Sequence, residues 1–294
     1  MTQHESTNSV IAGEDTWSES AMVLYFDDAL RNGLSLRISR FPDKGVTWVW
    51  CHVVHDGVVY TYTEPRLGCT PAKIDPGQMH AAYDSPGADA IIRRDGTSQT
   101  LQGMSFSARL LAHRGEGGED GSGSVPVLVE GTFAPGNLRS GSPRGRFERT
   151  GMIDAVVEVA GKRAVLSGLG KAHEQTQTRA RFGPAFTYAM LWGPSASLVA
   201  LASGGRSFGN HEAASGDRTV NTFEIGPWSP DRSFSVQLAD GETLAGHART
   251  VHKYRIPIFS KMWNGHIVAA DVGGDRMVGM INDWHGGGRS DGAS

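Results

Sequence analysis

Short stretches rich in apolar residues recur along the chain, and helical repeats of apolar residues are scarce. Six of them are rich in the β-branched and aromatic residues that favour strands: 46–54, 101–111, 156–166, 186–192, 233–238 and 254–258. In a strand, side chains at alternate positions share one face. The pattern predicts an all-β protein, with at most a turn or two of helix at 78–83.

Asp-Gly pairs separate several of these stretches and predict tight hairpin turns. They occur at Asp56-Gly57, Asp95-Gly96 and Asp240-Gly241. Both residue types tolerate the positive φ angles of a type I′ turn. The 39 glycines and 13 prolines of the 294-residue chain also favour many turns and few long helices.

Two polar, glycine-rich segments predict mobile loops, at 114–124 and 135–146. The second predicts a domain boundary. We therefore expect an N-terminal β domain at 13–145 and a C-terminal β domain at 146–285, with flexible tails at 1–12 and 286–294.

Charge and hydropathy limit the partners that we expect. The formal net charge is -3, and no Lys/Arg cluster is interleaved with aromatic residues, so nucleic acid is not expected as a partner. No apolar run approaches the roughly 20 residues that cross a bilayer, so stable membrane insertion is not expected either. The polar N-terminus lacks the features of a secretory signal, which predicts a soluble, cytoplasmic protein. Cys51 and Cys69 are interpreted as reduced packing thiols.

Two of the predicted strands carry aromatic residues at alternate positions. Alternation places Trp48, Trp50, His52 and Val54 on one face of their strand. Likewise, one face of the 186–192 strand carries the large side chains of Phe186, Tyr188, Met190 and Trp192. Such faces either fill a core or line a ligand cavity, and the buried polar atoms of His, Trp and Tyr need partners in both cases.

Scattered motifs over residues 14–285 resemble one known family. They are Trp17-Ser18-Glu19-Ser20, Trp48-Val49-Trp50, Phe147-Glu148-Arg149-Thr150-Gly151, Val159-Ala160-Gly161, Gly168-Leu169-Gly170-Lys171-Ala172-His173-Glu174, the run 188–192 and Gly279-Met280-Ile281-Asn282-Asp283-Trp284. Together they resemble the carotenoid 1,2-hydratase (hydroxyneurosporene synthase) and AttH-like family. The chain departs from the family at Gln175, where the family has Trp two positions after the histidine.

The resemblance implies two lipocalin-like (calycin-like) antiparallel β-barrels in tandem with a hydrophobic cavity. It also implies a scaffold that hosts hydratases of isoprenoid double bonds and cyclases of the pericyclic kind, which is an inference by analogy. Such reactions need a proton donor, an acceptor and a dry aromatic cavity, and they need no cofactor.

Three residues are the candidates for proton transfer: His173, His52 and Tyr188. Imidazoles titrate near neutral pH, and a phenol donates a proton or orients a carbonyl. Substrate-binding walls are expected from Trp48, Trp50, Phe186, Met190, Trp192, Trp17 and Trp284. Each of these residues has an equally simple interpretation as packing. His173 and Glu174 are expected on opposite strand faces. Glu19 is either a buried carboxylate with a raised pKa or a surface charge, and we favour the surface charge.

No metal and no organic cofactor is expected. His52 and His55 should face opposite ways on one strand, Gln177 stands where a zinc-protease pattern needs histidine, and Ala172 stands where a phosphate loop needs Ser or Thr.

The sequence leaves two functions open. The first is a cofactor-independent lyase or isomerase, of hydratase or cyclase type, that acts on a hydrophobic natural product such as a terpenoid, polyketide or steroid. The second is a binding or carrier protein for such a molecule. Catalysis by shape alone, as in a pericyclic cyclase, would need no essential acid or base. Oligomeric state and the part of the fold that holds the site stay open.

Overall fold

The chain is nearly all β, as the sequence predicts. The computed structural model describes residues 15–117, 123–140, 146–182, 184–258 and 261–285. Within these ranges the one helical element is a short 3-10 turn, η1 (Pro42–Lys44), and no helix has the length and apolarity that a bilayer crossing requires. The segment at 78–83 is a turn that leads into a strand rather than a helix, since the Gln78 amide donates to the Asp75 carbonyl (3.1 Å).

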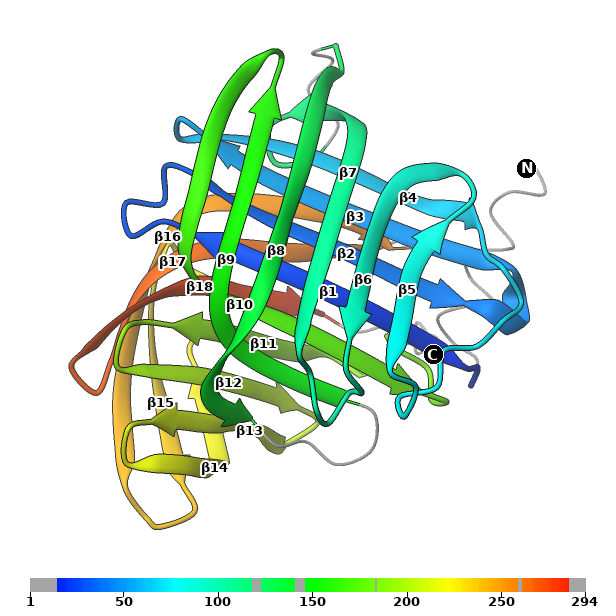
Figure 1. Cartoon of the computed structure of the whole chain (residues 1–294). Helices are drawn as coiled ribbons and strands as arrows, with labels where there is room; N and C mark the ends of the chain where they lie inside the picture. The colour runs from blue at the N-terminus through cyan, green and yellow to red at the C-terminus, as the bar shows by residue number, and fades with distance from the viewer. Residues whose placement is uncertain (1–14, 118–122, 141–145, 183, 259–260, 286–294) are drawn as a thin grey trace, which may run out of the picture.

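The first ten strands form one large antiparallel sheet (Figure 1). Its order is β4-β3-β2-β1-β10-β9-β8-β7-β6-β5, and an additional β4–β7 pairing curls the sheet round on itself. The strands are β1 (Ser18–Phe26), β2 (Gly33–Phe41), β3 (Val46–His55), β4 (Val58–Gly68), β5 (His80–Ser85), β6 (Ala88–Asp95), β7 (Gly103–Arg114), β8 (Val125–Ser140), β9 (Arg146–Val159) and β10 (Lys162–Gln177).

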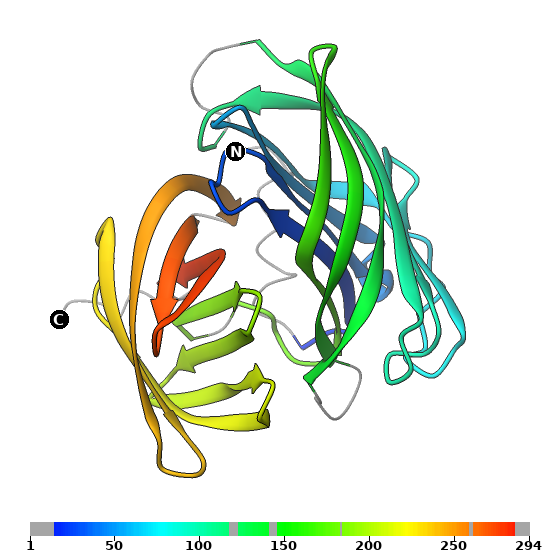
Figure 2. The same ribbon diagram turned by 60° about the vertical axis from the view of Figure 1, so that its left-hand side comes forward.

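The last eight strands form a closed antiparallel barrel that lies beside the large sheet (Figure 2). They are β11 (Phe186–Trp192), β12 (Ala196–Ser203), β13 (Arg206–Ala213), β14 (Gly216–Ile225), β15 (Asp231–Leu238), β16 (Thr243–Ile258), β17 (Lys261–Val272) and β18 (Asp275–Trp284).

The boundary between the two sheets lies later than the sequence predicts. β9 and β10 pair with β8 and β1, so they complete the large sheet rather than open the second domain at residue 146. The connection to the barrel runs between Gln177 and Phe186. Much of the glycine-rich 135–146 segment continues strand β8, because glycine and proline there sit where the ladder changes register. Part of that segment, part of the 114–124 loop and the whole of both tails lie outside the described residues.

Turn chemistry confirms one of the three predicted two-residue Asp-Gly turns, whereas Asp95-Gly96 and Asp240-Gly241 lie in longer loops between paired strands, where only the glycine has a positive φ angle. Asp56 and Gly57 have φ angles of 51° and 78°, which are the values that a type I′ turn between β3 and β4 requires. Ala160 and Gly161 make the equivalent turn between β9 and β10 with φ angles of 49° and 82°. The predicted strand 156–166 is therefore a hairpin that spans the end of β9 and the start of β10.

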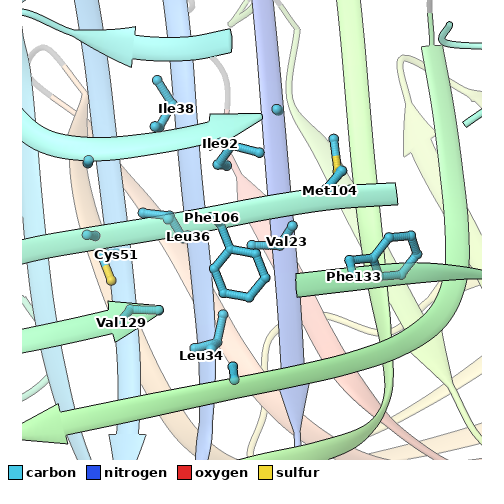
Figure 3. Packing of buried hydrophobic residues seen from close by; sticks show 14 of the residues in the cluster. Val23, Leu34, Leu36, Ile38, Cys51, Ile92, Met104, Phe106, Val129 and Phe133 are labelled. Carbon is cyan, nitrogen blue, oxygen red and sulfur yellow. The ribbon is translucent and has the colours of Figure 1, made fainter. Parts of the chain in front are cut away.

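Alternation along the strands separates three apolar cores. Inward-facing residues fill the large sheet, among them Leu34, Leu36, Phe106 and Phe133 (Figure 3). A second cluster, drawn from strands around the whole barrel, fills its interior with smaller residues such as Ala189, Leu191, Ala200 and Val236.

The third core lies between the two sheets. It joins Met22, Leu24, Trp48 and Trp50 of the large sheet to outward-facing residues of the barrel, including Met190, Trp192, Tyr254, Ile256 and Trp263. The aromatic faces predicted from the sequence are therefore outer faces packed against each other. The hydrophobic cavity that the resemblance implies is found between the sheets, while clusters of apolar side chains occupy the interiors of the large sheet and of the barrel.

Because this third core is buried like a domain interior, we expect the two sheets to unfold together. Trp192 is 1% exposed, stacks on Phe26 (6.0 Å between ring centroids) and donates from its indole to the Leu169 carbonyl (2.9 Å). Trp192→Ala should lower the free energy of unfolding by about 3–5 kcal/mol. Urea unfolding followed by fluorescence and circular dichroism measures this. The exposed Phe208 supplies the control, Phe208→Ala, which should change stability by about 0.5 kcal/mol or less. Two separate transitions in the wild type would contradict a shared core.

Candidate active site between the two sheets

Strand register aligns five side chains of the large sheet in one row, with one side chain from each of five strands. Each residue is the direct partner of the next, and alternation puts all five on the face that meets the barrel. From β3 to β9 the row is Trp50, Arg37, Met22, His173 and Glu148.

A cavity of about 300 Å³ lies where this row meets the barrel and the connecting segment. His173 and Arg37 line it from the large sheet, Tyr188 and Trp263 from the barrel, and Arg181 from the connection. A much smaller pocket of about 20 Å³ shares Arg37, Tyr188 and Trp263 with it and leads toward His52. The site is therefore an interface between two rigid faces, which suits a preorganised cavity.

Glu148 is the centre of a buried polar cluster. Its Oε1 accepts hydrogen bonds from Nδ1 of His173 (2.7 Å), from Nη2 of Arg146 (2.9 Å) and from the Tyr188 hydroxyl. Arg146 also donates to the Tyr188 oxygen (2.9 Å). Because an ionised carboxylate is an acceptor only, this arrangement assigns the Nδ1 proton to His173 and leaves Nε2 with a lone pair. Within the part of the chain that the structure describes, that Nε2 is buried and has no hydrogen-bond partner.

Burial and neighbouring charge set the protonation of this cluster. Burial lowers the pKa of His173 to about 4, against the opposing effect of Glu148, so the imidazole is neutral at pH 7. Burial by itself would raise the pKa of the Glu148 carboxyl, but His173, Arg146 and Lys171 lower that pKa below its ordinary value. Burial followed by the charge of Glu148 raises the pKa of Tyr188, so its hydroxyl stays protonated. The cluster therefore holds an ionised carboxylate, a neutral imidazole and a neutral phenol.

Aromatic side chains form the apolar wall of the cavity. Trp263 contacts Trp50 (5.8 Å between ring centroids), Phe186 (5.3 Å) and Phe182 (5.7 Å). Tilted and edge-on pairs of this kind are rigid because each ring is held by several others. The wall gives a planar or polyene ligand a surface with little room for water.

The structure brings some of the predicted site residues to the cavity and leaves others out. His173, Tyr188 and Phe186 line the 300 Å³ cavity, while Trp50, His52 and Met190 line the small pocket next to it. Trp48 packs behind Phe182 (5.5 Å), and Trp284 packs on the same ring (5.4 Å). Trp192 lies farther along β11 and seals the interface. Trp17 donates to Glu19 (2.8 Å) beside Lys73 and lines neither cavity.

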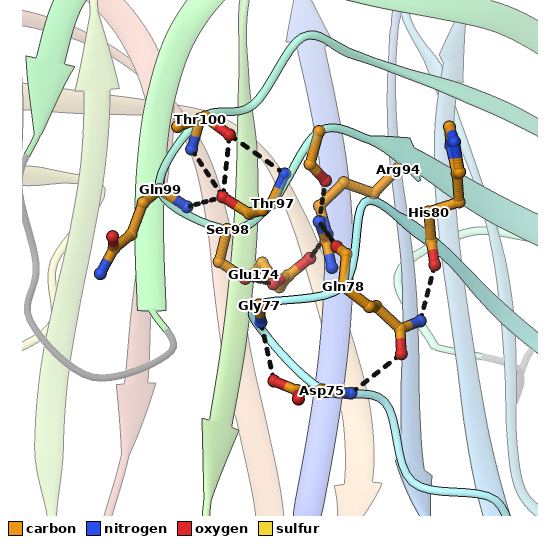
Figure 4. A network of polar contacts seen from close by, with 11 residues as sticks. Asp75, Gly77, Gln78, His80, Arg94, Thr97, Ser98, Gln99, Thr100 and Glu174 are labelled. Atoms are coloured by element: carbon orange, nitrogen blue, oxygen red, sulfur yellow. Dashed lines mark hydrogen bonds and ion pairs between the residues drawn. The ribbon is translucent and has the colours of Figure 1, made fainter.

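His173 and Glu174 face opposite sides of β10, as predicted. Glu174 points into the large sheet, where it forms an ion pair with buried Arg94 (2.6 Å) and accepts from Ser98 (Figure 4). Glu19 also points inward. It is 0% exposed and pairs with Arg40, so the interpretation of Glu19 as a surface charge is wrong. Both inward carboxylates accept hydrogen bonds from loop residues, Ile74 for Glu19 and Ser98 for Glu174, and they lie away from the cavity.

His52 is held differently from His173. Its ring stacks on Tyr254 (3.9 Å between centroids), and its Nδ1 lies 3.4 Å from the Thr61 hydroxyl, which itself donates to the Gly115 carbonyl. Burial lowers the pKa of His52 to about 3. Beside so small a pocket, the role that this geometry favours is packing and support of the aromatic wall.

Sequence reasoning missed Glu148, Arg146, Arg37 and Arg181 as site residues. A signal for Glu148 was present, because the turn at Ala160-Gly161 is the symmetry centre of a hairpin and places residue 148 opposite residue 173. The arginines had no such signal, since their contacts come from strands distant in sequence. Among the described residues, no group of three or more His, Cys, Asp or Glu is placed to hold a metal ion.

Comparison with known proteins identifies the fold. No family model and no curated protein sequence matches the chain. Among solved structures it is similar to CghA in complex with Sch210972 (TM-score 0.53, 10% identity, covering 94% of this chain and 90% of CghA). It is also similar to a putative AttH from Nitrosomonas europaea (TM-score 0.56, 10% identity, covering 92% of this chain and 92% of that protein). A third similar structure is kievitone hydratase from Nectria haematococca (TM-score 0.56, 8% identity, covering 95% of this chain and 91% of that protein).

At these identities the likeness is one of fold. It confirms the AttH-like, lipocalin-type architecture that the sequence motifs imply. The carotenoid hydratase part of the resemblance stays a prediction.

The pKa of His52 gives a test of its burial. Because that pKa is lowered in the folded protein, His52 binds a proton in the unfolded chain at pH values where it stays neutral in the folded chain. The free energy of unfolding therefore falls as the pH drops from about 6.5 toward 3. His52→Phe should remove this penalty and flatten the decline by about 1.4 kcal/mol per pH unit between pH 6 and 4. Urea unfolding at a series of pH values measures it, with His247→Phe, at an exposed position, as the control. An unchanged slope in His52→Phe would show that His52 is protonated in the folded protein.

Proposed function

We propose that this chain is a cofactor-independent lyase or isomerase, of hydratase or cyclase type, that acts on a hydrophobic natural product in the cavity between its two sheets. The substrate class is a terpenoid, polyketide or steroid. One observation carries the proposal: a neutral, buried imidazole whose Nδ1 proton is fixed by a carboxylate and whose Nε2 lone pair is unpartnered within the described residues, beside an aromatic cavity.

The chemistry follows from that lone pair. His173 Nε2 accepts a proton from the substrate or from an attacking water, and the resulting imidazolium is stabilised by Glu148 at 2.7 Å. The same proton then returns to another atom of the substrate, so water is added, water is eliminated or a double bond moves without any net oxidation. Tyr188 and Arg146 keep Glu148 ionised and oriented through the transfer, which makes them positioning residues.

The comparisons support this proposal at the level of the scaffold. Kievitone hydratase is named for a hydration, and CghA is a protein of the same fold in complex with the compound Sch210972. The aromatic wall of Trp50, Trp263 and Phe186 suits the apolar body of such compounds, and it would also hold a developing cation against its π faces.

Incubation in deuterium oxide tests for turnover without knowledge of the product. A panel of kievitone, linear polyenes and prenylated phenols is incubated with the protein and analysed by liquid chromatography and mass spectrometry. A hydratase adds deuterium to carbon, a dehydratase lowers the mass by the loss of water, and an isomerase or cyclase changes the retention time of at least one compound. Tight binding with no change in the mass or retention time of any compound would favour the carrier alternative.

His173→Ala should then lower the rate of turnover by about a hundredfold to ten-thousandfold, because it removes the proton acceptor. His80→Ala, at an exposed position, should leave the rate unchanged. Steady-state kinetics on the compound identified above, with circular dichroism to verify folding, make the comparison. Full activity in His173→Ala would remove His173 from the mechanism and favour catalysis by shape alone.

The pH profile tests the protonation assignment. Because the pKa of His173 is lowered to about 4, kcat/KM should be level near neutrality and fall below pH 4, as the imidazole is protonated. In Glu148→Gln the carboxylate that raises this pKa is lost, so the acid limb should move to lower pH while kcat also falls. An acid limb near pH 6.5 in the wild type, or an unmoved limb in Glu148→Gln, would contradict the assignment.

A further inference from the structure

The polar side of the cavity is strongly cationic. Arg37, Arg146 and Arg181 line it, together with the exposed Arg179 of the connecting segment. Arg146 is balanced by Glu148 at 2.9 Å. In the described parts of the chain, no carboxylate lies within ion-pair distance of Arg37 or Arg181. The mechanism above gives neither of these two arginines a role.

Arg37 and Arg181 are held in place and converge on one point. Nη2 of Arg37 and Nη2 of Arg181 both lie within hydrogen-bond distance of the Ser20 hydroxyl, at 3.3 and 3.1 Å. Each Nε donates to another serine, Ser39 for Arg37 (3.1 Å) and Ser18 for Arg181 (2.9 Å). Two like charges are therefore fixed side by side by neutral hydroxyls.

Aromatic faces limit the motion of both groups further. Arg37 lies over Trp50 (5.4 Å from guanidinium carbon to ring centroid), and Arg181 lies over Phe41 (5.7 Å). A guanidinium has five N–H donors in one plane, and each of these two groups donates two of them to serine hydroxyls. The remaining donors are available to a ligand at the cavity.

The energetics of this arrangement are unfavourable without an anion. Burial and then mutual repulsion lower the pKa of Arg181 well below its usual range, and burial lowers the pKa of Arg37 to about 10. Glu148 acts on Arg37 and Glu19 on Arg181, but both carboxylates already have their own arginine partners. A desolvated pair of cations is stabilised most by a ligand that brings negative charge.

We propose that Arg37 and Arg181 form an anion subsite, and that the hydrophobic substrate carries a carboxylate that binds there. The inference rests on the proposed function only for the use of the same cavity. The two oxygens of a carboxylate accept coplanar N–H donors from the guanidinium forks, and the apolar body then lies against Trp50, Trp263 and Phe186. A phosphate dianion is more strongly hydrated, and this cavity has neither a lysine nor a metal group among its described residues to replace that hydration.

Ligand binding tests the subsite without any need for turnover. Three compounds share one aromatic body: 2-naphthoate, 2-naphthalenemethanol and 2-naphthyl phosphate. Titration calorimetry at pH 7.5 should show the carboxylate binding at least about tenfold more tightly than the alcohol, as charge-assisted hydrogen bonds predict. Equal affinity for carboxylate and alcohol would overturn the subsite, and tighter binding of the phosphate would overturn the assignment to a carboxylate.

Variants locate the effect. Arg37→Gln and Arg181→Gln should each weaken 2-naphthoate by about tenfold and leave 2-naphthalenemethanol unchanged. Arg163→Gln removes one positive charge at an exposed position of the β9–β10 hairpin and is the matched control. Equal loss of both ligands in the Arg37 and Arg181 variants would assign these arginines to the shape of the cavity and overturn the proposal.

His173→Ala separates this inference from the proposed function. That variant should lose turnover and keep the preference for 2-naphthoate. If the wild type shows this preference but no turnover, the anion subsite is supported and the proposed enzymatic function is contradicted.

Discussion

The buried carboxylate of Glu148 is the constraint on which the site depends. It lies on β9, accepts a hydrogen bond from Nδ1 of His173 on the neighbouring strand β10 and accepts another from the Tyr188 hydroxyl on β11 of the barrel. A buried charge is tolerated only when it is paired and hydrogen-bonded. The need to satisfy Glu148 therefore holds the two sheets in one relative position and also fixes which nitrogen of His173 carries the proton.

Packing explains why the site lies between the sheets rather than inside either of them. The interior of the barrel is filled by small residues such as Ala189 and Leu191, and the interior of the large sheet by residues such as Phe106. The large aromatic side chains lie on the outer faces, where two curved surfaces cannot mesh everywhere. A cavity remains beside Trp263, and it is walled by residues that are rigid because both cores support them.

Alternation and turn chemistry predicted most of the fold from the sequence. The faces of β3 and β11 and the opposite directions of His173 and Glu174 follow from a period of two. The turn at Asp56-Gly57 follows from two residues that tolerate positive φ angles. The boundary at residue 146 was wrong because a β-sheet closes through partners distant in sequence, and nothing local shows that β10 pairs with β1. For the same reason the convergence of Arg37 and Arg181 on Ser20 was not predicted. The catalytic role of His173 stays a prediction.

Nitrogen-15 NMR of the histidine rings at pH 7 tests the central claim most directly, since it reports the proton on each ring nitrogen. The signal of His173 is identified among the 11 histidines by its loss in His173→Gln. We expect Nδ1 to carry the proton and Nε2 to be unprotonated. An imidazolium, or a neutral ring with its proton on Nε2, would contradict the role of Glu148 and with it the proton acceptor at the cavity.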